Sequence, residues 1–500
     1  MHLLNSRYPM TDAMRLPARH RFPRMVVWLV LAVLCAAPSF GQASTPAPLP
    51  ESPAPSAAKK NFWARLGDYY HQDWAPPASS STAAASPALP RRGLPSPLDS
   101  PPFPSSDWSY GGSPTIGEAD TNSYPLMTAW NGANGRTKVY GWFEPSVNGS
   151  TSSHSNGPVA DDVYSNRVEL DQLVVYVERL PNSVQRDHVD FGYHLTAFYG
   201  TDYRNTTDLG YMSFQLLKDK HQYGFDPVLE YADIYFPHVK QGMNLRIGRF
   251  TSIAGIESQL APTDYMFSHS LLYSIDPGTD TGILATVQMS DHWVAQAGVT
   301  AGHDVAPWTT DARPAATVCA SHTTSSVNDN FYLCANGIND GKYAYNNTQQ
   351  YDATWYHKLS KTWHTATEVY SMSQREVPSV FPTQNGGPIK PEANTYGATC
   401  HPGLIRCFAP EYAAMNYLNK EFNAHNSLSF RSDLLNDKKG QRTGVNTKYT
   451  ENTLMFQHWW GSTVQLRPEV RFDHAWDRKA YDDGAKQNQF MVASDLIFHF

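Results

Sequence analysis

The sequence predicts an all-β protein: a closed antiparallel transmembrane β-barrel of about 14 strands, with a range of about 12 to 16. An even number is expected because bacterial single-chain barrels have even strand numbers. Three observations predict this fold. The chain ends on an alternating strand, similar strands of about 10 residues recur from residue 137 onward, and aromatic residues make up 13% of the chain. Tilted strands of that length cross a bilayer, and aromatic rings gather at both membrane interfaces.

The first 43 residues have the pattern of a secretory signal. Three arginines precede an apolar run from Met25 to Ala37, and small residues follow it. This run is shorter than the roughly 20 residues that a membrane-spanning helix needs. Cys35 raises the alternative of lipidation, but Leu34 stands where a lipoprotein signal has a small residue. We expect residues 1–43 to be removed on export.

A linker without a fold of its own is expected next. Pro, Ala and Ser dominate residues 44–105, and such a composition buries too little apolar surface to fold. Within it, residues 61–72 are rich in aromatic side chains and are expected to form a short amphipathic helix, or else an isolated apolar patch. A lead-in segment, 106–136, then precedes the barrel at 137–500.

The last strand gives the clearest alternation. Its apolar face, interrupted by Ser494, is formed by Phe490, Val492, Leu496, Phe498 and Phe500. Gln489, Asp495 and His499 share the other face with Met491, Ala493 and Ile497. An open apolar edge at the end of a chain promotes aggregation, whereas a closed barrel has no edge. The alternative is the last strand of a soluble sandwich.

Charged residues on the opposite faces of several strands are expected to line a lumen. The candidates are Arg246, Arg431, Asp433, Arg467, Glu469, Arg471 and Asp473. Charges that line a pore determine its ion preference, whereas the net charge of the whole chain does not. Because both signs occur on the same strands, the sequence predicts no preference for anions or cations.

The connection from Thr251 to Asp280 is unusually aromatic for an outer loop. We expect it to fold into the lumen and to constrict it through Glu257, Asp264, Tyr265 and His269. An ordinary packed outer loop is the alternative.

Four cysteines remain after removal of the signal. They form two pairs that are local in sequence, Cys319 with Cys334 and Cys400 with Cys407. In an exported protein an even, clustered count favours disulfides, although a crosslink between the two pairs or free thiols are alternatives. We expect both pairs to lie in long outer connections, Gly302 to Gln349 and Gln374 to Tyr412.

Several segments together resemble the outer-membrane β-barrel porins of the OmpL-like type. These segments are Arg246 to Phe250, Gly255 to Ser258, Ala261 to Thr263, Ser268 to Tyr273, Asp437 to Gly444 and Arg467 to Arg471. The resemblance covers about residues 106–500. It implies a bacterial outer-membrane barrel and passive transport, and it brings no catalytic residues.

The predicted function is therefore that of a porin for small hydrophilic solutes. A plugged receptor or structural barrel is one alternative, and an outer-membrane hydrolase using His269 with a neighbouring serine is another. We expect no cofactor and no metal, and the net charge of -7 argues against a nucleic-acid partner. Expected partners are outer-membrane lipid and the barrel-assembly machinery, the latter through the strand that ends at Phe500. Oligomerisation is left open.

Overall fold

The structure is a computed structural model of the chain. It describes residues 60–75, 116, 124–131, 135–326, 328–380, 397–423 and 425–500. The predicted signal and most of the predicted linker lie outside the described residues, so those predictions remain untested.

The described chain consists mainly of strands. They are β1 (Lys138–Ser150), β2 (Val168–Arg179), β3 (Asp190–Gly200), β4 (Gly224–Asp226), β5 (Glu230–Phe236), β6 (Met243–Thr251), β7 (Thr279–Ser290), β8 (Trp293–His303), β9 (Ala315–Thr323), β10 (Asp329–Ile338), β11 (Gln349–Lys358), β12 (Trp363–Pro378), β13 (Arg406–Asn423), β14 (Asn426–Asp437), β15 (Thr447–Trp460), β16 (Val464–Ala475) and β17 (Asn488–His499). The helices are α2 (Phe62–Asp73), α3 (Pro125–Asn131), α4 (Tyr203–Thr206), α5 (Phe214–Leu217), and the 3₁₀ turns η2 (Ala261–Thr263) and η3 (Tyr273–Ile275).

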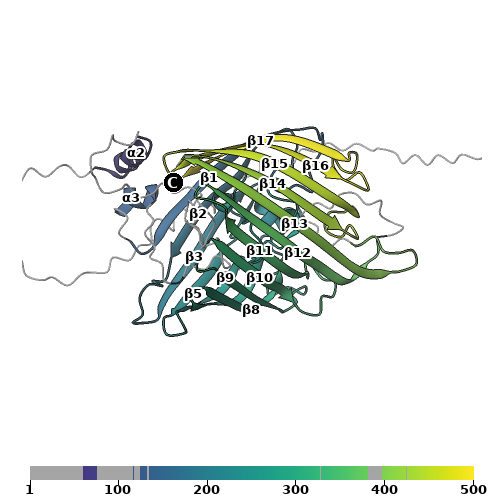
Figure 1. Ribbon diagram of the computed structural model, residues 1–500, viewed down its shortest axis with the longest axis horizontal. Helices are drawn as coiled ribbons and strands as arrows, with labels where there is room; N and C mark the ends of the chain where they lie inside the picture. Colours follow the sequence, from purple (N-terminus) through teal and green to yellow (C-terminus); the bar gives the residue numbers. More distant parts are fainter. Residues whose placement is uncertain are drawn as a thin grey trace, which may run out of the picture. The chain divides into compact units, whose positions relative to one another are not determined.

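These strands form one closed antiparallel barrel (Figure 1). Neighbours in sequence pair with each other, and β1 pairs with both β2 and β17, which closes the sheet. The short strands β4 and β5 both pair with β3 and together occupy one position in the wall, so the barrel has 16 strand positions. The closed barrel confirms the predicted fold class, and its strand number lies at the upper end of the predicted range.

Short and long connections alternate around the barrel. Two residues join β7 to β8 and three join β15 to β16, whereas the connections at the opposite end include 151–167 and 252–278. In bacterial barrels the short turns face the periplasm and the long loops face outward. Following that rule, we call the end of the barrel that holds the start of β1 and the end of β17 the periplasmic end.

Side chains of the strands alternate between an inner face, which carries most of the charged groups, and an outer face, which is largely apolar. In β17, Gln489 and Asp495 are buried, whereas Phe490 and Val492 on the outer face are 45% and 50% exposed. At the periplasmic end, exposed tryptophans stand at the strand ends: Trp293, Trp363 and Trp460. This arrangement has the apolar band and the aromatic girdle of a membrane barrel.

One predicted connection is wrong. The segment Gly302 to Gln349 is not a long outer loop, because it contains the hairpin of β9 and β10. The sequence of β9 has Val318 as its one large aliphatic residue, together with alanines, Cys319, His322 and small polar residues. Its faces therefore differ little in hydrophobicity, and its strand signal is weak.

Helix α2 occupies the segment 61–72 that was expected to be helical. Its N-terminus is capped by the Asn61 side chain, which accepts a hydrogen bond from Ala64 N at 2.9 Å. No helix within the described ranges combines the length and the apolar character needed to cross a membrane.

The C-terminal half of α2 binds to the periplasmic end of the barrel. The Asp73 carboxylate accepts hydrogen bonds from Ser462 N at 2.9 Å and from Thr463 Oγ1 at 2.8 Å, both in the β15–β16 turn. Tyr70 donates to the His499 carbonyl at 3.0 Å, and its ring lies 5.2 Å from that of Phe498. We call these contacts the α2 clasp.

Candidate functional site inside the barrel

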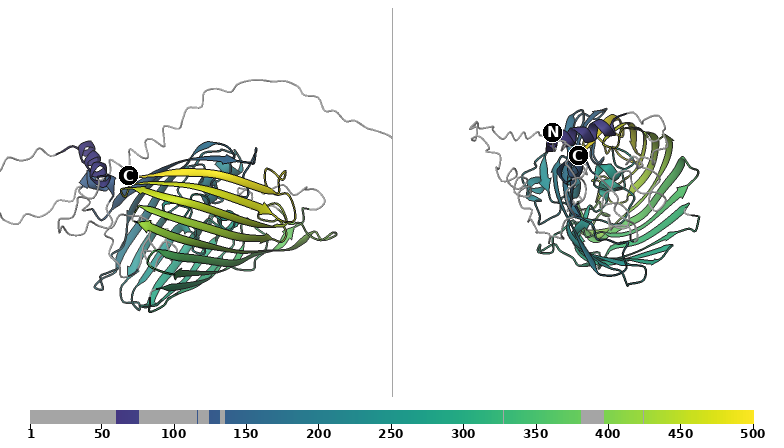
Figure 2. Two further views of the ribbon diagram at one scale, coloured as in Figure 1. Left: turned by 45° about the horizontal axis from the view of Figure 1, so that its top comes forward. Right: turned by 90° about the vertical axis from the view of Figure 1, so that its left-hand side faces the viewer.

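The β6–β7 connection, residues 252–278, is the central element of the interior. All residues from 259 to 273 are buried, and Figure 2 shows teal segments within the ring of strands when viewed along the barrel. The turns η2 and η3 make the connection compact, and Pro262 fits the first turn of η2 because its missing N–H needs no partner there. We call residues 252–278 the inserted loop.

Arginines of the facing wall bind the backbone of the inserted loop. Arg467 of β16 donates to the carbonyls of Ala261 at 3.0 Å and Met266 at 2.9 Å. Arg431 of β14 and Arg471 of β16 both donate to the His269 carbonyl, at 3.0 and 2.5 Å. A guanidinium offers several donors in one plane, so each arginine can hold the loop and a carboxylate at once.

Acidic side chains of the wall bind the backbone N–H groups of the same loop. Asp433 accepts from Leu271 N at 2.6 Å, and Glu469 accepts from Ser268 N at 3.1 Å. On another part of the wall, Glu368 of β12 accepts from Ile256 N at 2.7 Å. The backbone polar groups of a buried irregular segment need such partners, so these contacts allow the loop to lie inside the barrel.

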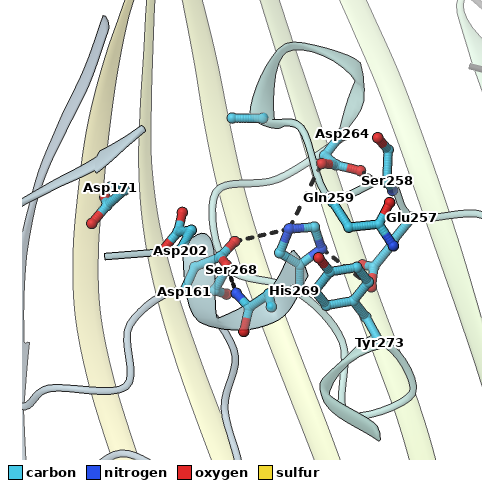
Figure 3. A network of polar contacts seen from close by, with 12 residues as sticks. Asp161, Asp171, Asp202, Glu257, Ser258, Gln259, Asp264, Ser268, His269 and Tyr273 are labelled. Atoms are coloured by element: carbon cyan, nitrogen blue, oxygen red, sulfur yellow. Dashed lines mark hydrogen bonds and ion pairs between the residues drawn. The ribbon is translucent and has the colours of Figure 1, made fainter. Parts of the chain in front are cut away.

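His269 lies at the centre of an acidic cluster (Figure 3). Its Nε2 is 2.8 Å from Asp161 Oδ2 and 3.7 Å from Asp264 Oδ2, and its Nδ1 is 3.6 Å from Glu257 Oε2. The Tyr273 ring stacks on the imidazole with 3.8 Å between centroids. Burial alone would lower the pKa of His269, but the charges of Asp161 and Asp264 outweigh it and raise that pKa well above the ordinary value.

Glu257 connects this acidic cluster to Arg431 on the barrel wall. Its carboxylate accepts from Ser270 N at 2.9 Å and from Arg431 at 3.1 Å, and Tyr417 also donates to it. Burial would raise the pKa of Glu257, but the hydrogen bond from His269 and the charge of Arg431 lower it below the ordinary value. Glu257 therefore carries its negative charge at neutral pH.

Six of the seven predicted lumen residues lie together on β14 and β16, facing the inserted loop. Arg431 pairs with Glu451, Arg467 with Asp495 and Arg471 with Asp473. Arg246 lies elsewhere, on β6, and pairs with Asp233 at 2.9 Å. Their role in lining a conducting lumen remains a prediction.

The four predicted loop residues divide into two groups. Glu257, Asp264 and His269 meet in the acidic cluster, whereas the ring of Tyr265 packs 5.1 Å from that of Tyr417. Their role in constriction likewise remains a prediction.

Sequence reasoning missed the acidic residues that approach the cluster from other elements. Asp161 lies in the β1–β2 connection, Asp202 follows β3, and Asp171 faces inward from β2 (Figure 3). Alternation along β2 was an available signal for Asp171. Nothing local in the sequence indicates that Asp161 contacts a histidine 108 residues later.

Both cysteine pairs form local disulfides, as predicted. Cys319 and Cys334 lie directly opposite each other on β9 and β10, so this bond lies in the barrel wall rather than in an outer loop. The second bond joins Cys400 of the β12–β13 connection to Cys407 of β13.

The Ser268 hydroxyl accepts a hydrogen bond from Arg471 Nη1 at 3.2 Å, and its side chain also hydrogen-bonds the Glu469 carboxylate. Among the described residues, no group of three or more His, Cys, Asp and Glu side chains is arranged to hold a metal ion.

Comparisons with known proteins agree with this architecture. The profile of a family described as "putative beta-barrel porin-2, OmpL-like" matches residues 138–500. No curated protein matches significantly.

Solved structures with a similar fold include three porins or outer-membrane proteins. An anion-selective porin from Comamonas acidovorans is 10% identical with a TM-score of 0.47, covering 73% of this chain and 99% of its own. The outer membrane channel DcaP of Acinetobacter baumannii is 9% identical with a TM-score of 0.45, covering 73% and 97%. A loop-deletion mutant of OmpT from Vibrio cholerae is 8% identical with a TM-score of 0.44, covering 73% and 99%.

Proposed function

The chain belongs to the OmpL-like putative beta-barrel porin-2 family, and from that membership we propose that it is a porin of the bacterial outer membrane, through which small hydrophilic solutes diffuse down their gradients. The pore selects solutes by excluding those that are too large and by attracting others through the charges of its lumen. No covalent chemistry is involved.

One observation carries this proposal. The charged side chains of the strands point mainly inward, together with some apolar ones such as Met491 and Ile497, whereas the outer face is largely apolar; in β17 Asp495 is buried and Val492 is exposed. An apolar exterior matches lipid, and a polar interior is compatible with water. The inserted loop then narrows the passage and sets the size limit.

Purified protein in a planar lipid bilayer tests the proposal. We expect stable conductance steps, with heat-denatured protein as the matched control. Vesicles loaded with sugars of increasing size should swell only up to a size limit. A folded, membrane-inserted barrel that gives neither conductance nor swelling would refute the porin proposal.

A plugged barrel is the second candidate, and the burial of residues 259–273 favours it. Under this alternative the inserted loop blocks the lumen permanently. Removing the arginine contacts of the loop should then convert a silent barrel into a conducting one. Lipid hydrolysis by silent protein would instead favour the hydrolase alternative.

The proposed partners follow from the fold. Outer-membrane lipid would contact the apolar faces, and small hydrophilic solutes would enter the lumen. The barrel-assembly machinery would recognise the final strand, whose last residue, Phe500, pairs with Gly141 of β1 through backbone hydrogen bonds of 2.9 and 3.1 Å.

A further inference from the structure

In the described part of this protein, buried acidic side chains outnumber buried basic side chains. Over the whole chain, 46 acidic residues stand against 39 Lys and Arg, which is close to balance. Among the buried side chains of the described residues, twenty-four are Asp or Glu and only eight are Lys or Arg. Within the described part of the chain, three carboxylates are therefore buried for every buried Lys or Arg side chain.

The protein's own cations cannot neutralise so many carboxylates. Arg431, Arg467 and Arg471 are already engaged by carboxylates and by backbone carbonyls of the inserted loop. Burying an uncompensated carboxylate is costly, so the remainder need either protons or cations from solution. A lumen that contains water supplies such cations.

One group of carboxylates illustrates this shortage of cationic partners. Asp352 of β11 is 4% exposed, and its carboxyl group shares a hydrogen bond with the Glu368 carboxyl group and accepts one from the Gly255 backbone, with no Lys or Arg among these partners. Glu368 of β12 and Asp276 of the inserted loop converge nearby on Gly255, within 3.4 and 3.7 Å of where a Cβ would stand. Burial raises the pKa of Asp276, and the charge of Glu368 raises it further, as expected for repelling carboxylates.

A second acidic region continues on the other side of the inserted loop. Asp171, Asp202 and Asp161 lead from the β2 wall toward His269 (Figure 3). Asp171 and Asp202 share Thr201 Oγ1 as a hydrogen-bond donor, at 3.0 and 3.2 Å. Here the protein supplies the imidazolium of His269 and the guanidinium of Arg204, whose charges both act on Asp202, among several carboxylates.

We propose that this barrel passes cations in preference to anions, and that Asp352 and Glu368 are among the residues that determine the preference. The inference rests on the proposed porin function and specifies the class of solute: small hydrophilic cations, including metal cations and ammonium compounds. Because no described cluster is arranged as a fixed metal site, the cations are mobile in the lumen rather than resident.

Reversal potentials of the purified full chain test the inference. With a KCl gradient of about tenfold across a planar bilayer, the K⁺/Cl⁻ permeability ratio should exceed one and should decrease at high salt, because salt screens charges. A ratio of one or below, with clear conductance steps, would overturn the cation preference alone. Absence of conductance would overturn the porin function and the inference with it.

Paired variants locate the effect. In Asp352→Asn with Glu368→Gln, which keep the side-chain shapes, the permeability ratio should fall at least about twofold. The matched control is Asp187→Asn with Asp291→Asn, which also removes two charges, but from exposed periplasmic turns. The control should keep the wild-type ratio. An unchanged ratio in the first pair would remove these two residues from the assignment. The wild-type ratio tests the cation preference by itself, so misfolding of a variant would not affect that test.

Discussion

Nε2 of His269 lies 2.8 Å from Oδ2 of Asp161, and this contact joins two outer connections inside the barrel. Asp161 belongs to the β1–β2 connection and His269 to the inserted loop. The inserted loop, which already contacts arginines of β14 and β16, is therefore also held to the β1–β2 connection by this ion pair. The strength of the ion pair depends on the protonation of the His269 imidazole.

Alkaline pH should loosen the inserted loop. The pKa of His269 is raised in the folded protein, so its stabilising contribution is complete below the unfolded pKa of about 6.5 and is lost as pH rises through the folded pKa. Neutral His269 leaves Asp161, Asp264 and Glu257 to repel one another. Single-channel recordings over increasing pH should show a larger or noisier conductance.

The variant His269→Gln provides the comparison. It lacks the titrating group, so its conductance should already be altered near neutral pH and should change less at alkaline pH. An identical alkaline response in wild type and variant would contradict the assignment of the effect to His269.

Replacing Arg431 by Met should release the inserted loop from its wall. The change removes the hydrogen bond to the His269 carbonyl and leaves Glu257 and Glu451 without their guanidinium partner. Breaking a buried pair in this way costs about 3 to 5 kcal/mol of unfolding free energy. Urea unfolding in detergent should show this loss, whereas Arg478→Gln, at an exposed position, should match wild type.

The lipid-facing surface can be tested at Val470, in the middle of β16. Its side chain is exposed on the outer face. Val470→Arg should destabilise the barrel in lipid vesicles by about 2 to 4 kcal/mol, because the charge would lie in the bilayer. Val184→Arg, in the periplasmic β2–β3 turn, should change the free energy of unfolding by no more than about 0.5 kcal/mol.

Loss of the Cys400–Cys407 disulfide should loosen the β12–β13 connection. Closing a loop of this length restricts the unfolded chain by about 2.5 kcal/mol in the loop-entropy model. Cys400→Ser with Cys407→Ser should therefore speed proteolytic cleavage in that connection while leaving the barrel folded. Equal cleavage rates with and without the bond would show that the connection is held by other contacts.

The α2 clasp can be tested through one carboxylate. Asp73→Ala removes the acceptor of the Ser462 amide, so that amide should exchange its hydrogen faster in the variant. Asp68→Ala is the matched control, because Asp68 pairs only with the exposed Lys60 in the described chain. An unchanged exchange rate in Asp73→Ala would show that the Ser462 amide is protected without the clasp.

Alternation along single strands predicted the barrel, and it did so best where large apolar residues alternate with charges. In β16, Val470 and Phe472 flank Arg471, and the structure places the two faces as predicted. In β9, alanines and small polar residues reduce the contrast between faces, and the strand was mistaken for part of a loop. The central estimate of about 14 strands was therefore lower than the observed 16, which lies within the predicted range.

The interior was predictable only in part. The composition of the inserted loop indicated that it would avoid open water, and its burial agrees with that expectation. Its partners were not predictable, because the contact of His269 with Asp161 depends on how two connections fold inside the finished barrel. The excess of buried carboxylates was equally hidden, since the chain as a whole is nearly balanced in charge.

The α2 clasp also constrains the order of events in biogenesis. Helix α2 precedes every barrel strand in the chain, yet its binding surface is made by the β15–β16 turn and the end of β17. That surface exists only after the last strands have been synthesised and paired. The helix can therefore dock only after these strands have formed, and its docking marks a barrel in which the last strands are in place.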